Sequence, residues 1–296
     1  MENKIYNPAN YERATLEEYG YKKYKSLKIF WSILSKILLI FAIFMLYFAV
    51  IVIAIQSFNS SDSTTEFVSF TFDNYINMFS KRGLNSAIFN TFKTSIFATL
   101  IATALGTLVA IGTFYLPPKI KNRLTLLNNI PLLNADIVTG TSLMIIFSIF
   151  LPLNHKIFGF WTILIAHIYF IFPYIILSVL PKMKEIDPNM LDASLDLGVK
   201  PFKSVLKVII PAIKGGIFSG LMLAFTISFE DFVVGYFTTG NGYNTLSIWI
   251  YNSIGRKSLF PGVYAFSTSL TLLTILGILI YYFVKGRIGA KNEKKN

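Results

Sequence analysis

The sequence predicts an all-α integral membrane protein with about six transmembrane helices, and three observations lead to this prediction. Hydrophobic residues make up 54% of the chain and charged residues only 14%. Apolar stretches recur along its 296 residues, and each is long enough to cross the ~30 Å hydrocarbon core of a bilayer as a helix. Lysine and arginine alternate between rich and poor connecting segments, as they do in multi-pass membrane proteins. A soluble domain of this length needs no such pattern.

Residues 1–28 form a polar, tyrosine-rich leader that ends in four lysines just before the first apolar stretch. We expect this leader to be cytoplasmic or interfacial, with Thr15 and Glu18 as the capping box of a short helix. The leader is too long and too polar to be the first part of a cleaved signal peptide. The first transmembrane helix is therefore expected to be retained.

Six candidate spans follow the leader, and together they make residues 29–285 the transmembrane domain. The third span is the least regular because it contains Pro131, Asn134 and Asp136. The last residues, 286–296, are expected to form a cytoplasmic tail. The six spans are residues 29–57, 86–115, 126–151, 159–181, 209–236 and 264–285.

The positive charges indicate the orientation of these spans. Most lysines and arginines lie in the leader, in residues 116–125 and 182–208, and in the tail, whereas the other connecting segments carry few. Because short basic loops stay in the cytoplasm, we expect both termini and residues 182–208 to be cytoplasmic. The same distribution accounts for the formal net charge of +12 without a nucleic-acid partner.

Several kinds of active site are excluded by residues that the sequence lacks. Cysteine is absent, so there is no disulfide and no thiolate metal site. Only two histidines are present and they are far apart, which argues against a zinc site or a histidine-dependent nucleophile. No GxxxxGK[ST] phosphate loop occurs. We therefore expect no enzyme activity, no metal and no cofactor in this chain.

Three acidic residues lie inside predicted spans, where each costs about 2.5–3.5 kcal/mol to insert. Asp136 is in the third span, and Glu230 and Asp231 are in the fifth beside Phe232 and Tyr236. Carboxylates and aromatic faces together suit an elongated organic cation. The alternative is that the acids pair with lysines or backbone groups inside the bundle. Adjacent helical residues point about 100° apart, so both acids of the pair can face one lumen only if the helix is broken.

Residues 187–211 form the only long amphipathic segment between strongly hydrophobic stretches. Asp187 and Pro188 suit the start of a short helix, and Gly198 suits its end, because a residue without a Cβ enters the left-handed conformation at no steric cost. Pro201 is placed to begin a second short helix. The expected structure is a helix, a glycine turn and a helix that together dock on a cytoplasmic partner.

This segment resembles the EAA loop of the permease subunits of ABC importers, through Asp192-Ala193-Ser194, Gly198 and the apolar stretch that ends at Pro211. Asp replaces the usual Glu, Ser replaces the second Ala, and Ile precedes the proline where Leu is usual. The alternative is an ordinary solvated amphipathic loop. The resemblance implies that the loop inserts into a groove of a separate ATPase subunit, through Asp192, Ala193, Ser194, Leu197, Gly198, Pro201 and Phe202.

Four further stretches resemble the PotC-like permeases of spermidine/putrescine ABC importers: FNSS at 58–61, NADIVTGTSLMIIF at 134–147, FWTILIAHIYFIFPY at 160–174 and FTISFEDFVVGYFTTG at 225–240. The resemblance implies the type I ABC importer permease fold. It also implies that Asp136 and Asp231 match acids lining the polyamine route, with Glu230 where those permeases commonly have Met-Asp-Asp. The leader has no counterpart in the resemblance.

The resemblance also implies a function and a set of partners. The chain would form half of the translocation path for spermidine or putrescine in a bacterial plasma membrane. Its expected partners are a second, homologous permease subunit (PotB-like), an ATPase subunit dimer (PotA-like) that binds ATP and Mg, an extracellular polyamine-binding protein (PotD-like) and membrane lipid. Two alternatives remain: an ABC importer permease for another solute, and an ion-coupled secondary carrier that works alone.

Overall fold

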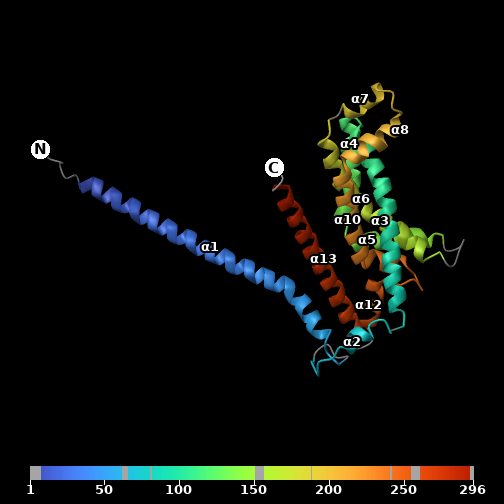
Figure 1. Ribbon diagram of the computed structural model, residues 1–296, viewed down its shortest axis with the longest axis horizontal. Coiled ribbons are helices and arrows are strands. Elements are labelled where there is room, and N and C mark those ends of the chain that lie inside the picture. Colours follow the sequence, from blue (N-terminus) through green and yellow to red (C-terminus); the bar gives the residue numbers. More distant parts are fainter. Residues whose placement is uncertain are drawn as a thin grey trace. The chain divides into compact units, whose positions relative to one another are not determined.

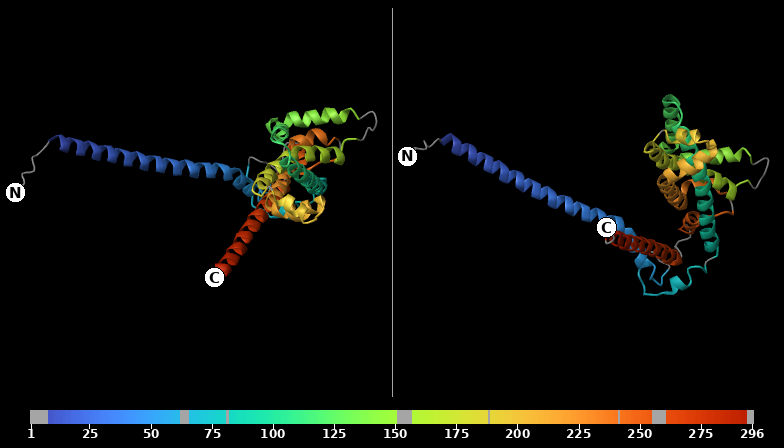
Figure 2. Two further views of the ribbon diagram at one scale, coloured as in Figure 1. Left: turned by 90° about the horizontal axis from the view of Figure 1, so that it is seen from above. Right: turned by 45° about the horizontal axis from the view of Figure 1, so that its top comes forward.

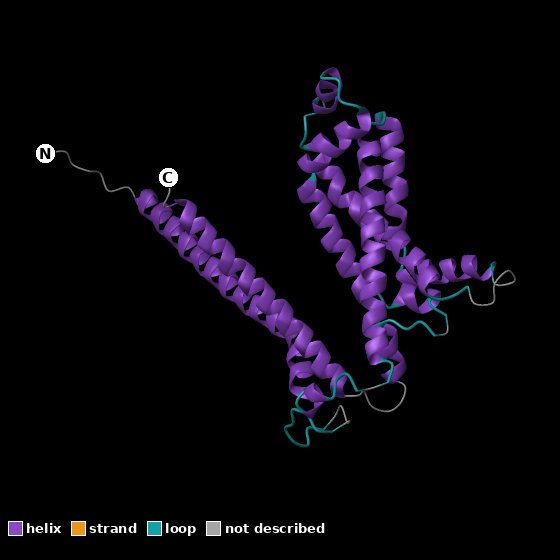
Figure 3. Cartoon of the chain, turned by 45° about the vertical axis from the view of Figure 1, so that its right-hand side comes forward, coloured by secondary structure: helices purple, strands orange, loops and turns teal. Residues whose placement is uncertain are grey.

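The computed structural model describes residues 8–61, 66–80, 82–150, 157–187, 189–240, 242–254 and 261–293. Within these ranges every regular element is a helix, and the only β pairing is an isolated bridge between Asn59 and Phe70 (Figure 3). The all-α class is therefore confirmed. The chain divides into two compact units, Met1–Met78 with Phe260–Asn296, and Phe79–Leu259.

The helices account for all six expected spans. Among the described residues, four helices are long and apolar enough to cross a membrane, and two pairs of helices qualify if each bent pair counts as one span. The four single helices are Leu27–Gln56, Leu84–Phe114, Phe160–Lys184 and Pro261–Ile280, and the pairs are Pro118–Leu133 with Asp136–Ser148 and Pro201–Ala212 with Lys214–Glu230.

The first unit contains α1 (Pro8–Gln56), α2 (Asp73–Ile76) and α13 (Pro261–Glu293). The helix α1 is continuous over 49 residues (Figures 1 and 2), so the separate short helix expected to begin at Thr15 is wrong. The long helix forms because no proline or glycine interrupts the apolar stretch after Gly20. Likewise, α13 continues through the expected start of the tail to Glu293.

The segment after α1 is held by buried Asn59, which lies in the FNSS stretch. Its amide donates to the Glu66 carbonyl at 2.7 Å, and its Oδ1 accepts from the Val68 N–H at 3.1 Å. The ring of Phe58 stacks on Phe70 with centroids 5.0 Å apart. These contacts hold Glu66, Val68 and Phe70 against the end of the first span.

The core of the second unit is formed by α3 (Leu84–Phe114), α6 (Phe160–Lys184) and α10 (Lys214–Glu230), which pack on one another (Figure 1). Small residues allow this close approach. A Cβ added to Gly106 of α3 would lie 2.9 Å from Ile175 of α6, and one added to Gly216 of α10 would lie 3.0 Å from the Ser178 carbonyl.

A polar stripe runs along the buried face of α3. Ser95, Thr99, Thr103 and Thr107 recur every four residues and are nearly inaccessible, and their hydroxyls have no hydrogen-bond partner in the described chain. Because these hydroxyls make no hydrogen bond among the described residues, the shape of the packed side chains and not hydrogen bonding fixes this interface.

The third span is not the continuous helix expected over residues 126–151. It consists of α4 (Pro118–Leu133) and α5 (Asp136–Ser148), which meet at an angle of 100°. Asn134 and Ala135 between them are extended, with ψ of 143° and 140°. Pro131, which has no N–H to donate, lies three residues before this break.

The fifth span is also broken, and the continuous helix expected to Tyr236 is wrong. The helix α10 ends at Glu230, Asp231 has an extended ψ of 131°, and a new helix, α11, covers Val233–Thr238. The next helix, α12, covers Leu246–Ile254.

Four short elements lie between α6 and α10 and contain the expected docking segment. They are α7 (Met190–Asp196), α8 (Pro201–Ser204), the π-helical turn η1 (Val205–Ile209) and α9 (Ile210–Ala212). The wide turn η1 directly precedes α9, which contains Pro211, and was not predicted.

Candidate functional site

The glycine turn of the docking segment has the geometry that its sequence predicts. Gly198 has a φ of 79°, its N–H donates to the Leu195 carbonyl at 2.8 Å, and the Val199 N–H donates to the Ser194 carbonyl at 3.2 Å. These two bonds form a Schellman motif that ends α7. The first helix begins at Met190 with Asn189 as its N-cap residue, so the expected start at Asp187 is wrong. Asp187 instead holds a local turn before the helix, because its Oδ1 accepts from the Asn189 N–H at 2.9 Å. Pro188 lies outside the described residues.

The tip of the docking segment presents apolar side chains to the surroundings. Leu197 is 85% exposed and Phe202 is 71% exposed, whereas Ser194 and Ser204 are buried. Large exposed apolar side chains that lie close together on a surface are typical of a protein interface.

The docking segment is also close to the end of α3. Burial, and then the charge of Asp192, raise the pKa of Tyr115, which caps the C-terminus of α3.

At the break in the fifth span, Asp231 supports the start of α11. Its Oδ2 accepts from the Gly235 N–H at 2.7 Å, and its Oδ1 accepts from the Val234 N–H at 3.2 Å. The first N–H groups of a helix have no partners within the helix, and a carboxylate at this end is favourable. Asp231 therefore caps α11.

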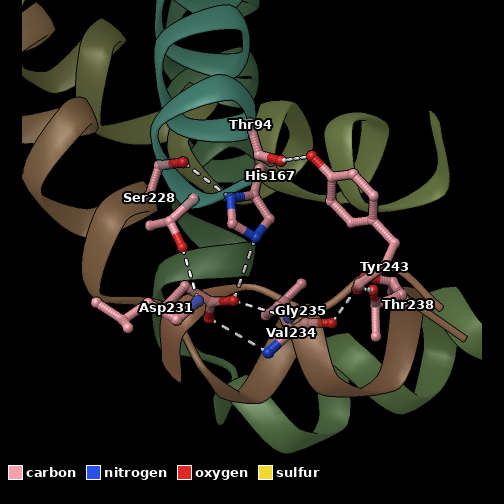
Figure 4. A network of polar contacts seen from close by, with 11 residues as sticks. Thr94, His167, Ser228, Asp231, Val234, Gly235, Thr238 and Tyr243 are labelled. Carbon is pink, nitrogen blue, oxygen red and sulfur yellow. Dashed lines mark hydrogen bonds and ion pairs between the residues drawn. The ribbon is translucent and has the colours of Figure 1, made fainter. Parts of the chain in front are cut away.

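The same carboxylate contacts His167 of α6 (Figure 4). Asp231 Oδ2 lies 3.3 Å from His167 Nε2, at ion-pair distance but without the alignment of a hydrogen bond. His167 Nδ1 lies 2.8 Å from the hydroxyl of Ser228 in α10. All three side chains are buried, so the network joins α6, α10 and α11 in an environment where polar groups need partners.

Gly235 makes room for this network. A Cβ at this position would lie 3.2 Å from Asp231 Oδ2 and 3.3 Å from Ile163 Cδ1. The hydroxyl of Thr162, five residues before His167 in α6, donates to the Thr238 carbonyl at 2.7 Å. Both ends of α11 are thus tied to α6.

The segment after α11 is tied to α3 by side-chain contacts. The Tyr243 and Thr94 hydroxyls lie 2.9 Å apart (Figure 4). The amide of Asn90 donates to the Asn244 carbonyl at 3.0 Å, and the Leu246 N–H donates to the Thr91 hydroxyl at 2.7 Å. These contacts fix α12 relative to α3.

An aromatic cluster, consisting of Phe232, Tyr236 and Tyr251, lies beside the capped break. The ring centroids of Phe232 are 5.4 Å from Tyr236 and 4.8 Å from Tyr251, and the two tyrosines are 5.5 Å apart. Both tyrosines are exposed. Tyr236 also lines a pocket of about 640 Å³ together with Phe237, Thr239, Asn244 and Asn252, among others.

The other two acids of the predicted path are exposed. Glu230 ends α10, immediately before the break, and Asp136 lies in the first turn of α5. Neither carboxylate has a hydrogen bond or ion pair within the described residues. Asp136 is close enough to Tyr174 of α6 for an electrostatic interaction. Free carboxylates of this kind are available to a cation.

The structure thus separates residues that the sequence grouped together. It brings Phe232 and Tyr236 into one cluster, leaves Asp136 and Glu230 accessible, and places Asp231 in a buried ion pair. The surroundings of Asp231 therefore correspond to the alternative given above, in which an acid pairs with other groups inside the bundle. His167, Ser228 and Tyr251 were not predicted, although a histidine inside the apolar stretch 160–174 needs a polar partner and so pointed to an acid elsewhere.

Comparison with known proteins gives consistent results across sequence and structure. Residues 102–291 match the family described as binding-protein-dependent transport system inner membrane component. The chain is 30% identical over 234 residues to the spermidine/putrescine transport system permease protein PotC of Escherichia coli strain K12, covering 79% of this chain and 87% of that protein. It is 29% identical over 259 residues to the putrescine transport system permease protein PotI of the same strain, covering 84% and 89%.

A solved structure has the same fold. It belongs to a bacterial ABC transporter involved in the import of the acidic polysaccharide alginate, and the match has a TM-score of 0.62 and covers 88% of this chain and 96% of that chain. The sequences are 14% identical, so this likeness concerns the fold alone. It identifies the architecture as that of an ABC importer permease.

Proposed function

Since this chain belongs to the family of binding-protein-dependent transport system inner membrane components, and is a multi-pass membrane protein with bacterial relatives, we propose that it is a permease subunit of an ATP-driven polyamine importer. The observation that carries the proposal is the similarity to the spermidine/putrescine permease PotC over 79% of the chain. The geometry of the site supports the same substrate class.

The proposed path uses the free acids and the aromatic cluster. Polyamines carry several ammonium groups separated by methylene chains. Asp136 and Glu230 would pair with ammonium groups, while the faces of Phe232 and Tyr236 would attract them by cation–π contacts. Asp231 would act on the path indirectly, because capping α11 fixes the direction in which Phe232 and Tyr236 project.

The proposed coupling element is the docking segment of residues 187–211. Leu197 and Phe202 would enter a groove of an ATPase subunit, and Asp192, Ala193, Ser194, Gly198 and Pro201 would hold the turn in shape or line its edge. Closure of the ATPase dimer would then pull on the end of the core helices and change access from one side of the membrane to the other. Such rigid-body changes between two packed arrangements are a common switching mechanism.

The proposed complex contains four kinds of component. A second permease (PotB-like) completes the path, a dimer of ATPase subunits (PotA-like) binds ATP and Mg, and an extracellular binding protein (PotD-like) delivers the polyamine. The absence of a phosphate loop from this sequence supports placing ATP hydrolysis in the ATPase subunits. In this arrangement both termini and the docking segment face the cytoplasm.

The proposal is tested by measuring ATP hydrolysis of the purified complex in liposomes, with and without polyamine-loaded binding protein. Stimulation by spermidine or putrescine, but not by a neutral or anionic solute, is the expected result. If only a different solute stimulates hydrolysis, the assignment as an ATP-driven importer stands and the assignment of polyamines as its substrates fails. A chain that transports in the absence of any ATPase subunit would be a secondary carrier, and the proposal would fail.

A further inference from the structure

We propose that a stripe of side chains on α1, comprising Lys25, Lys28, Ser32 and Lys36, binds the phosphate of an anionic membrane phospholipid. We call these four residues the lysine stripe. The inference is independent of the polyamine function, because it concerns the first unit and none of the acids or aromatic residues of the proposed path.

The lysine stripe lies on one face of the helix. Its positions recur at intervals of three or four residues, which places them above one another along α1. The four residues also line a shared concave surface of about 500 Å³, together with Tyr24, Ile29 and Ile33. From Lys25 to Lys36 the stripe extends over about 16 Å at 1.5 Å per residue.

The three ammonium groups of the stripe have no counter-charge within the described chain. The ion pairs found there join His167 to Asp231 and Lys182 to Glu185, and no described residue accepts a hydrogen bond from a lysine of the stripe. Like charges on one helical face repel each other. An external anion would remove this repulsion.

The position of Lys36 fixes the level of that anion in the membrane. The apolar helix Leu27–Gln56 is 30 residues long, which is more than the ~30 Å hydrocarbon core of a bilayer requires. Its last part, residues 37–56, spans about 30 Å and fills that core alone. Lys36 therefore lies at the boundary between hydrocarbon and headgroups, and Ser32 and Lys28 follow one and two turns farther out. Lipid phosphates occupy this level.

The neighbours of the stripe favour a lipid over a free phosphate ion. Ile29 and Ile33 adjoin the lysines and are about half exposed, as are Phe30 and Trp31 nearby. None of the apolar window of this helix is buried within the chain. Isoleucines can contact acyl chains, and aromatic residues anchor a helix at the headgroup level, whereas an inorganic phosphate ion would use neither.

The experiment compares lipid binding by two variants that lose equal charge. The full chain, with the subunits that co-purify with it, is delipidated and titrated with phosphatidylglycerol or phosphatidylcholine, and bound lipid is counted by native mass spectrometry. Lys28→Gln with Lys36→Gln is the test variant. Lys119→Gln with Arg123→Gln is the control, since both control residues are exposed on α4 and lie outside the stripe.

The affinity for phosphatidylglycerol should fall about fivefold for each lysine removed, if each contributes the ~1 kcal/mol of a basic residue near an anionic surface. Phosphatidylcholine binding and the control variant should be unchanged. The variant Lys36→Arg keeps the charge and should bind phosphatidylglycerol as the unsubstituted chain does. It therefore separates the loss of the positive charge from a loss of folding. Equal affinity in the test and control variants would overturn the proposal, as would full displacement of the lipid by an equal concentration of inorganic phosphate.

Discussion

The two broken spans of the second unit place an aspartate beside an extended backbone, yet the two aspartates have opposite surroundings. Asp136 follows the break between α4 and α5, is exposed and has no hydrogen bond or ion pair within the described chain. Asp231 forms the break between α10 and α11, is buried, and contacts two backbone N–H groups and His167.

The difference shows that an acid at a membrane break has two uses. A buried carboxylate satisfies the helix end that the break exposes, and this use consumes its hydrogen-bonding capacity. An exposed carboxylate at the same kind of break remains available to a passing cation. Glu230 and Asp231 make the same contrast between adjacent residues, because the first is exposed and the second is buried.

The largest expected effect is on stability, from removing the buried acid. Asp231→Ala leaves the N–H groups of Val234 and Gly235 without their acceptor and removes the contact with His167, and each buried donor left unsatisfied costs about 1–3 kcal/mol. The measurement is the thermal unfolding of the detergent-purified chain. Asp231→Asn keeps one acceptor oxygen, so its free energy of unfolding should fall by less, about 1–3 kcal/mol.

A double substitution sharpens this prediction. If the carboxylate and the imidazole interact directly, the combined loss in Asp231→Ala with His167→Ala should be smaller than the sum of the two single losses. Additive losses would mean that the contact contributes nothing and that Asp231 acts only as a helix cap.

The next effect should be on transport rather than stability. Asp136→Asn removes a charge that has no partner in the described chain, so the fold and the complex should persist. Hydrogen bonds to charged groups contribute about 1.5–3 kcal/mol, so polyamine uptake into vesicles should fall by about tenfold or more. Asp73→Asn, in the exposed first turn of α2, is the matched control. Normal uptake by the Asp136 variant would remove this residue from the path.

A smaller effect is expected at the docking segment. Gly198 has a φ of 79°, and a β-branched residue in such a conformation costs about 1–3 kcal/mol. Gly198→Val should therefore weaken retention of the ATPase subunit during purification of the complex. Gly198→Asn should retain it better, because asparagine tolerates the left-handed region. If both variants retain the ATPase fully, the turn does not govern docking.

The smallest effect concerns the aromatic cluster. Tyr236→Leu removes a face to which an ammonium group can bind, and exposed cation–π contacts contribute about 0.5–1 kcal/mol. The half-saturating polyamine concentration for uptake should rise about two- to fivefold. Tyr236→Phe keeps the face and should behave like the unsubstituted chain. Equal losses for Tyr236→Phe and Tyr236→Leu would assign the role to the hydroxyl instead.

Much of this architecture could be predicted because it depends on local sequence. The apolar stretches predicted the spans, and Gly198 with Pro201 predicted the turn and the start of α8, because each signal lies within a few residues of its effect. The breaks at Asn134 and Asp231 were harder to predict. The second is held by His167, which lies more than sixty residues earlier in the chain, and no periodicity within α10 records that contact.

The candidate site was predicted in part for the same reason. All three acids were identified by their residue type and by their position within a predicted membrane span, and both can be read from the sequence. Which acid is free depends on burial and on partners from other helices. The contact of Tyr251 with Phe232 likewise depends on α12 folding back beside α11, and the sequence carries no local signal for that return.

The unpaired hydroxyls on the buried face of α3 have a consequence for motion. Ser95, Thr99, Thr103 and Thr107 make no side-chain hydrogen bond across the interface, so a displacement of α3 along its neighbours breaks none there. The resistance to such sliding comes from steric fit, as where Gly106 meets Ile175. At these four positions a shift of α3 against its neighbours is therefore opposed by packing and not by hydrogen bonds.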